Sequence, residues 1–306
     1  MECRMRWSVR TLAALLFVCL GKWTASPQKA DSTIKVDVDL TLVNVTVSDH
    51  RNRRITDLQA EHFQLWEDKI EQQISYFSSE EMPVSLGILL DVSGSMGDKI
   101  SAARNAVATF LKSGNPEDQY FLIEFSNRPS LAQDFTTDIS RLQNRVIFTR
   151  TKGMTAMYDA AYMGLEKLSE RNDPKKAILL ITDGEDNHSR YSAANIKEYL
   201  KEQDVQIFAI GITSEIGQGR SGRVVIEELT GISGGSSFFP NSIYDLEDIC
   251  TKIAIELRNQ YVLGYRSTNA NKDGKWRKIR VKVNPPPGSP KLSVHARSGY
   301  YAIQQD

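Results

Sequence analysis

Five residues of this sequence have the types and spacing to hold a metal ion: Asp91, Ser93, Ser95, Thr155 and Asp183. The first three alternate with other residues after the apolar run 84–90, and Gly94 between them lets the chain curl inward. Carboxylate and hydroxyl oxygens in such a loop suit a small hard cation, Mg²⁺ or Mn²⁺. The simpler interpretation is that Ser95 or Asp98 only caps the helix that follows.

The segments around these residues predict an α/β fold in which the five can meet. Residues 84–90 and 176–182 are continuous apolar runs, as expected of parallel strands buried on both faces, and helical patterns alternate with them. Each run ends in an aspartate, and Thr155 lies in a glycine-containing loop between them. In an open α/β sheet, ligands bind at the carboxyl ends of the strands, near the reversal in strand order. The sequence therefore predicts that the five side chains converge at one edge of the sheet.

The combined pattern Asp-x-Ser-x-Ser, a distant Thr and a distant Asp resembles the metal-ion-dependent adhesion site of von Willebrand factor type A (VWFA) domains, with all five positions filled. The resemblance implies a Rossmann-like A domain in which these residues hold Mg²⁺ or Mn²⁺, directly or through water. It further implies that the metal keeps one vertex for an Asp or Glu carboxylate of a protein partner. Four residues are expected at the rim of this site: Gly153, Met154, Glu185 and Asp186. The last two are also interpretable as exposed loop charges.

Two other functions compete with metal-dependent adhesion. Ser95, Asp183 and His188 follow the chain order of an α/β-hydrolase triad, but Ser93 stands where the nucleophile elbow needs glycine. The second alternative is a metal-dependent assembly or chaperone-like subunit of an envelope complex. No phosphate-binding Gly-x-x-x-x-Gly-Lys loop is present in the sequence. We therefore expect a binding module and no enzyme.

The first 26 residues predict export. Three arginines precede the apolar run 12–20, which is the layout of a signal peptide and is shorter than a membrane span. Removing residues 1–30 leaves 33 basic and 37 acidic residues of the original 38 and 38, so nucleic acid is not an expected partner. Only Cys250 then remains, within an apolar helix pattern, and we expect it in the core. We expect a periplasmic, outer-envelope or secreted protein with no membrane span in its mature chain.

The predicted domains are the signal peptide at 1–26, a β segment at 31–82, the A domain at 83–257 and a second β segment at 258–303 that pairs with the first. The A domain would then be inserted in, or flanked by, a small β-sandwich. Residues 62–67 and 70–77 predict a hairpin around Asp68-Lys69. Both flanks, for example Trp66-Glu67-Asp68 and 260–265, resemble secreted VWFA-related proteins catalogued mostly from acidobacterial genomes. That family usually has Gly where Lys69 stands, so the hairpin is expected to differ locally.

The last helix of the A domain is expected at 244–257. The glycine-rich stretch 231–235 before it predicts a loop that can absorb backbone change. In the related integrin inserted domains, ligand binding is coupled to sliding of the last helix. The resemblance therefore raises two alternatives, a sliding helix and a static helix packed on the sheet.

Overall fold

A computed structural model describes residues 40–51, 53–183, 186–212, 220–286 and 288–302. Its central sheet has the strand order β10-β9-β8-β5-β6-β7. The strands are β5 (Ser85–Asp91), β6 (Gln119–Phe125), β7 (Pro129–Thr136), β8 (Lys176–Thr182), β9 (Gln206–Gly211) and β10 (Ser237–Phe238). All neighbours are parallel except β6 and β7. The continuous apolar runs of β5 and β8 are buried along nearly their whole length, which confirms the predicted parallel sheet.

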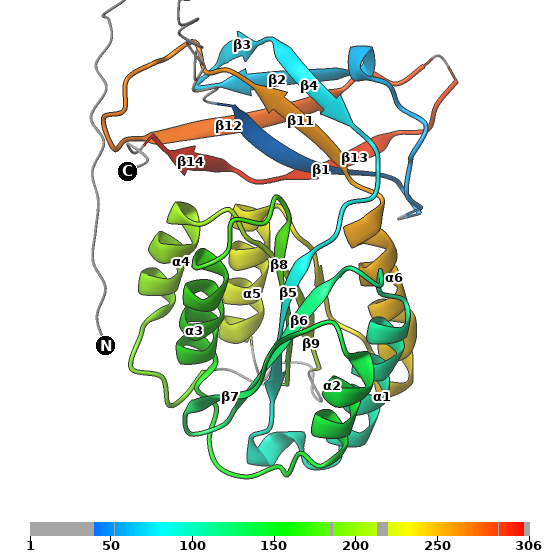
Figure 1. The fold of residues 1–306 in the computed structure, drawn as a ribbon, viewed down its shortest axis with the longest axis vertical. Coiled ribbons are helices and arrows are strands. Elements are labelled where there is room, and N and C mark those ends of the chain that lie inside the picture. Colours follow the sequence, from blue (N-terminus) through cyan, green and yellow to red (C-terminus); the bar gives the residue numbers. More distant parts are fainter. Residues whose placement is uncertain (1–39, 52, 184–185, 213–219, 287, 303–306) are drawn as a thin grey trace, which may run out of the picture. The chain divides into compact units, whose positions relative to one another are not determined.

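Helices cover both faces of this sheet (Figure 1). On one face lie α1 (Ile100–Lys112), α2 (Ile139–Ile147) and α6 (Leu246–Arg258), and on the other α3 (Met157–Ser169), α4 (Ala193–Glu202) and α5 (Arg220–Ser233). Each set closes its own apolar core against the strands. Cys250 of α6 is fully buried in the first core, as expected, and burial raises the pKa of its thiol to about 12. The fold class predicted from the sequence is confirmed.

Two antiparallel sheets are built from strands before and after this α/β unit. One has the order β13-β1-β11-β4 and the other β14-β12-β2-β3. Their bounds are β1 (Thr41–Asp49), β2 (Phe63–Glu67), β3 (Ile70–Gln72), β4 (Ile74–Ser78), β11 (Tyr261–Tyr265), β12 (Trp276–Val283), β13 (Leu292–Ala296) and β14 (Gly299–Tyr301). Side chains of both sheets share one apolar core, for example Val45 and Leu263 from the first and Leu65 from the second. The two β segments of the chain therefore pair with each other.

The hairpin expected around Asp68-Lys69 is present, but its second strand is divided between the two sheets. β3 pairs with β2, whereas β4 pairs with β11. Both turn residues have positive φ, 47° at Asp68 and 72° at Lys69. This is the backbone of a two-residue hairpin turn, in which the second position favours glycine.

The expected loop at 231–235 is wrong in part. Gly231 to Ser233 form the last turn of α5, and the helix ends at Gly234, whose φ is 78°. The N–H of Gly235 donates to the carbonyl of Thr230 at 3.0 Å, which is the closing bond of a glycine-terminated helix. The helix continues through Gly231 because Leu229 and Ile232 pack on the sheet core. Only the last two residues of the expected loop lie outside a helix.

The part of the chain that the structure describes also contains three short 3₁₀ turns: η1 (Ala60–His62), η2 (Gly94–Met96) and η3 (Ile243–Asp245). Within the described residues no helix is long and apolar enough to cross a membrane. The signal peptide predicted at 1–26 and the rim residue Glu185 lie outside those residues.

Candidate metal centre

Strand order places the predicted ligands at one edge of the central sheet. β5 has β6 on one side and β8 on the other, so the direction of winding reverses between β5 and β8. Leu90 of β5 pairs in register with Ile181 of β8, and Asp91 and Asp183 follow at the same carboxyl edge. Open α/β sheets bind ligands at this reversal.

Asp91 is a fully buried carboxylate held by two hydrogen bonds. Its Oδ1 accepts the backbone N–H of Ser93 at 2.9 Å, and its Oδ2 accepts the hydroxyl of Thr182 at 2.6 Å. Burial raises the pKa of Asp91, and the nearby charge of Asp183 adds to that increase, while the two hydrogen bonds lower it. A buried carboxylate whose ionised form is disfavoured gains stability from a nearby cation.

The two serine hydroxyls connect to the second carboxylate. The Oγ atoms of Ser93 and Ser95 lie 3.0 Å apart, and Ser95 Oγ donates to Asp183 Oδ1 at 2.8 Å. Gly94 between them donates its N–H to the carbonyl of Gly153 at 2.9 Å. A Cβ at Gly94 would lie 3.3 Å from that carbonyl oxygen, so glycine lets the two loops approach closely.

Thr155 is fixed on the neighbouring loop through its backbone. Its N–H donates to Asn187 Oδ1 at 2.8 Å, and its carbonyl accepts the N–H groups of Asn187 and His188. Its side chain is buried, and the contact between Gly153 and Gly94 joins its loop to the serine loop. Within the described part of the chain, no direct hydrogen bond links Thr155 to the other four candidates. Those four are connected by hydrogen bonds, either directly or through the Thr182–Asp183 dipeptide.

The described rim residues differ in their roles. Met154 is 48% exposed, and its N–H donates to Asn127 Oδ1 at 2.7 Å. Asp186 accepts the N–H of Tyr158 at 3.0 Å, at the first turn of α3, and also the N–H and hydroxyl of Ser189. Asp186 therefore stabilises the start of a helix, a role that the sequence interpretation missed.

Lys99 is the functional candidate that sequence reasoning missed. Its ammonium lies 2.5 Å from Asp183 Oδ2 and 3.1 Å from the carbonyl of Ser95, and the Lys99 and Asp183 side chains are only 9% and 1% exposed. The available signal was its position four residues after Ser95, at the start of a helix, from which a long side chain reaches back over the preceding turn. The centre thus contains an internal cation as well as two carboxylates.

The donor set fits a hard divalent ion. Asp91 and Asp183 would supply two negative charges, and the serine hydroxyls, with Thr155 on the adjoining loop, would supply neutral oxygen ligands. No group of three or more His, Cys, Asp or Glu side chains arranged for metal binding occurs among the described residues. That observation leaves the fit unchanged, because three of the five predicted ligands are hydroxyls.

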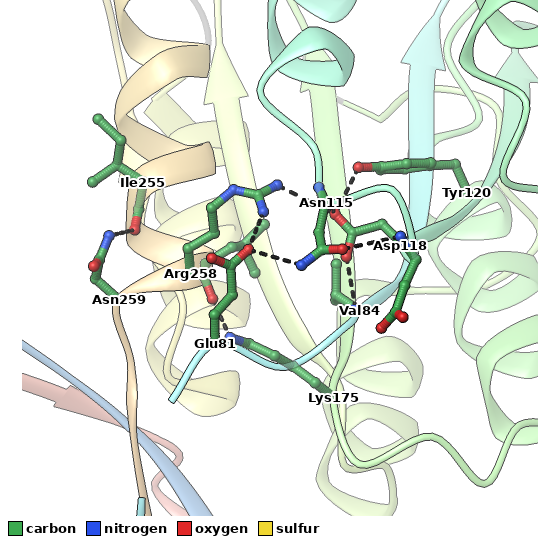
Figure 2. Close-up of polar contacts among 11 residues, drawn as sticks. Glu81, Val84, Asn115, Asp118, Tyr120, Lys175, Ile255, Arg258 and Asn259 are labelled. Carbon is green, nitrogen blue, oxygen red and sulfur yellow. Dashed lines mark hydrogen bonds and ion pairs between the residues drawn. The ribbon is translucent and has the colours of Figure 1, made fainter. Parts of the chain in front are cut away.

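A second polar cluster lies at the opposite end of the strands (Figure 2). Asp118, just before β6, accepts the N–H of Val84 at 2.9 Å and the hydroxyl of Tyr120 at 2.8 Å, and it pairs with Arg258 at 3.2 Å. Arg258 also pairs with Glu81 at 2.5 Å. The cluster therefore joins the segment that enters the α/β unit to the end of α6, from which the chain leaves it.

Comparison with known proteins agrees with this geometry. Residues 86–185 match the von Willebrand factor type A domain. Inter alpha-trypsin inhibitor heavy chain 4 of Mus musculus is 28% identical over 47% of this chain and 17% of its own length. The Bos taurus heavy chain H4 is 23% identical over 63% of this chain and 23% of its own length. The chain thus spans less than a quarter of these relatives.

A solved structure shows the same fold. The von Willebrand factor type A protein of Catenulispora acidiphila superposes with a TM-score of 0.52 and 11% identity, covering 80% of this chain and 75% of that one. The sequence match contains α1, β8 and all of β5 except its first residue, and it includes Asp91, Thr155 and Asp183. The α/β unit of this chain therefore has the fold of von Willebrand factor type A domains, and residues 86–185 match that domain in sequence.

Proposed function

We propose that this chain is an exported, non-enzymatic protein-binding module that recognises an Asp or Glu carboxylate of a partner through Mg²⁺ or Mn²⁺. The metal would be held by the five residues predicted from the sequence: Asp91, Ser93, Ser95, Thr155 and Asp183. When bound, the ion supplies Lewis acidity toward a partner carboxylate. Export rests on the composition of the first 26 residues.

The observation that carries the proposal is the hydrogen-bonded chain from Ser93 through Ser95 to Asp183, beside the buried Asp91. Apart from the Lys99 ammonium, these are hard oxygen donors, and two carboxylates balance one divalent charge. The protein positions the oxygens before any partner arrives, because Thr182, the Ser93 N–H and the Gly94–Gly153 contact fix the loops.

The geometry favours this function over hydrolysis. In a serine triad the nucleophile hydroxyl donates to an imidazole that a carboxylate orients. Here the Ser95 hydroxyl donates directly to Asp183 at 2.8 Å. His188 is exposed, and its backbone N–H is bonded to Thr155.

Calorimetric titration of the purified chain with Mg²⁺ and Mn²⁺ tests the proposal. We expect binding by the natural chain and none by Asp91→Ala, with melting temperature raised by metal only in the former. The matched control is Asp98→Ala, which removes an exposed carboxylate seven residues along the chain. Unchanged metal affinity in Asp91→Ala would refute the proposal that Asp91 and its four neighbours hold the metal.

A pull-down from envelope extract, with Mg²⁺ and with EDTA, tests the partner. Capture that depends on Mg²⁺ and is lost in Asp91→Ala supports adhesion through the metal. A stable complex that keeps its composition in EDTA would instead favour the alternative of a structural subunit in an envelope assembly.

A further inference from the structure

The outer face of one sandwich sheet gathers four cations around a tryptophan. Lys278, Arg280 and Lys282 are exposed at alternate positions of β12, and Trp66 lies directly opposite Arg280 on β2. Residues paired in this way project from the same face of the sheet. With Lys69 of the β2–β3 turn they line a hollow of about 380 Å³. These five residues are called the basic face below.

The charges of the basic face are not neutralised by ion pairs within the described parts of the chain. None of the four forms an ion pair there, whereas the formal charge of the whole chain is balanced at 38 basic and 38 acidic residues. Two carboxylates lie nearby: Glu71 accepts Gln64 Nε2, and Asp68 accepts the backbone N–H of Lys278. Four cations against two carboxylates leave this surface positive.

Lys69 stands in a backbone conformation that disfavours lysine. Its φ of 72° places it in the left-handed region, at the turn position where glycine would fit without strain. Its side chain nevertheless lines the hollow beside Trp66. Strained positions that persist in a fold point to a role of the side chain beyond the turn itself.

Trp66 orders the face and adds an apolar surface. The Lys282 ammonium lies 5.3 Å from the centroid of the indole ring, within range of a cation–π contact. Because Trp66 is only half buried, part of it stays open beside the cations. A ligand with negative charges and some apolar surface matches this combination.

We propose that the basic face binds an extended acidic segment of a partner protein. Alternate residues of a strand are about 6.7 Å apart, so Lys278, Arg280 and Lys282 repeat at the same interval as alternate side chains of any extended peptide. A segment with Asp or Glu at alternate positions therefore presents its carboxylates in register with the three cations. This contact is additional to the proposed metal-mediated one and does not depend on it.

The test uses the full chain in EDTA and a fluorescent ten-residue peptide with Glu at alternate positions and a central Leu. Binding measured by fluorescence anisotropy should weaken as salt increases. The double variant Lys278→Ser/Lys282→Ser should bind about tenfold more weakly, because two exposed ion pairs are lost. The control Lys112→Ser/Lys291→Ser removes the same charge from two other exposed positions, at the end of α1 and just before β13, and should bind as the natural chain does.

Lys69→Gly separates binding from folding. Glycine relieves the backbone strain, so this variant should melt at the same or a higher temperature while binding the peptide about threefold more weakly. A lower melting temperature would contradict the strain argument. Unchanged affinity in Lys278→Ser/Lys282→Ser would overturn the proposed site.

Two further arms distinguish the ligand class. The same peptide with Gln in place of Glu should not bind, and equal binding would refute recognition by charge. Heparin and vesicles containing phosphatidylserine test anionic polysaccharides and membranes. Binding of either, without binding of the acidic peptide, would overturn the peptide proposal. Because EDTA is present throughout, none of these outcomes depends on the metal centre.

Discussion

Replacing Lys99 with methionine should tighten metal binding and weaken the metal-free fold. The Lys99 ammonium lies 2.5 Å from Asp183 Oδ2, which is one of the two carboxylates proposed to hold the ion. Two carboxylates balance one divalent charge, so an ammonium kept in place leaves excess positive charge. Metal and Lys99 therefore compete for Asp183.

The magnitude follows from the contact that metal binding must break. A hydrogen bond between charged groups contributes about 1.5–3 kcal/mol, and both side chains here are almost fully buried. Removing about 2 kcal/mol of competition should lower the dissociation constant for Mg²⁺ about 30-fold. In the metal-free protein the same substitution leaves Asp183 buried without its cation, which should reduce the free energy of unfolding by about 3 kcal/mol.

Two measurements check both effects. Calorimetric titration gives the Mg²⁺ dissociation constant, and urea unfolding in EDTA and in saturating Mg²⁺ gives the stability of each state. Lys99→Arg is the control that keeps the charge: a cation stays beside Asp183, so this variant should not show the tighter Mg²⁺ binding of Lys99→Met. If Lys99→Met unfolds in EDTA, its rescue by Mg²⁺ still reports the affinity.

A Lys99→Met dissociation constant within threefold of the natural one would refute the competition. Equal metal-free stability would refute the claim that the ion pair balances Asp183. The double variant Lys99→Met/Asp183→Asn completes a double-mutant cycle. Removing both charges should recover most of the metal-free stability that Lys99→Met loses, while metal binding is lost.

Three further predictions concern other parts of the fold. Burial lowers the pKa of Lys175 to about 8, so between pH 8 and 9.5 the unfolded chain binds more protons at this residue than the folded protein does. The free energy of unfolding in urea should therefore rise by about 1.5 kcal/mol over that range, and Lys175→Met should remove the rise. Gly153→Ala should destabilise the metal-free protein by about 1–3 kcal/mol in urea, because φ is 82° and a Cβ would lie 2.6 Å from Asn127 Oδ1; a loss below 0.5 kcal/mol would contradict this. Leu65→Ala should reduce the unfolding free energy by about 2–5 kcal/mol, since Leu65 is fully buried in the sandwich core, whereas truncating the 58%-exposed Ile70 to alanine should cost far less.

The strands that are buried on both faces could be predicted from the sequence because their apolar runs are continuous. β5 and β8 coincide with the predicted runs to within one residue at each end. The helix α2 was missed, since it has only nine residues and buries only two of them, Leu142 and Val146, which makes its apolar stripe short. The division of the 70–77 strand into β3 and β4 was also missed. The alternation of apolar and polar residues shows which face of a strand is buried, but it does not show with which sheet the strand pairs.

The candidate site was predictable where its residues form a spaced pattern. Asp91, Ser93, Ser95 and Asp183 do meet, since strand ends converge at the reversal of strand order. The supporting residues were not predictable in this way. Thr182 and Asn127 act through contacts between segments distant in the chain, and nothing in their local sequence marks them. Lys99 was marked only by its position four residues after Ser95, and its contact with Asp183 joins distant segments.

The way in which the α/β unit joins the sandwich explains why the flanks can share one core. The chain leaves the sandwich after β4 and returns at β11, and Ser78 of β4 pairs with Val262 of β11. The chain therefore enters and leaves the α/β unit from neighbouring strands. The unit stands in the place of a long hairpin connection between β4 and β11, so the two sheets can still form one core. The ion pair between Glu81 and Arg258 then joins the two crossings again at the base of the unit (Figure 2). Because only Asn259 and Gln260 separate α6 from β11, any movement of that helix must act on the sandwich strand or be resisted by this cluster.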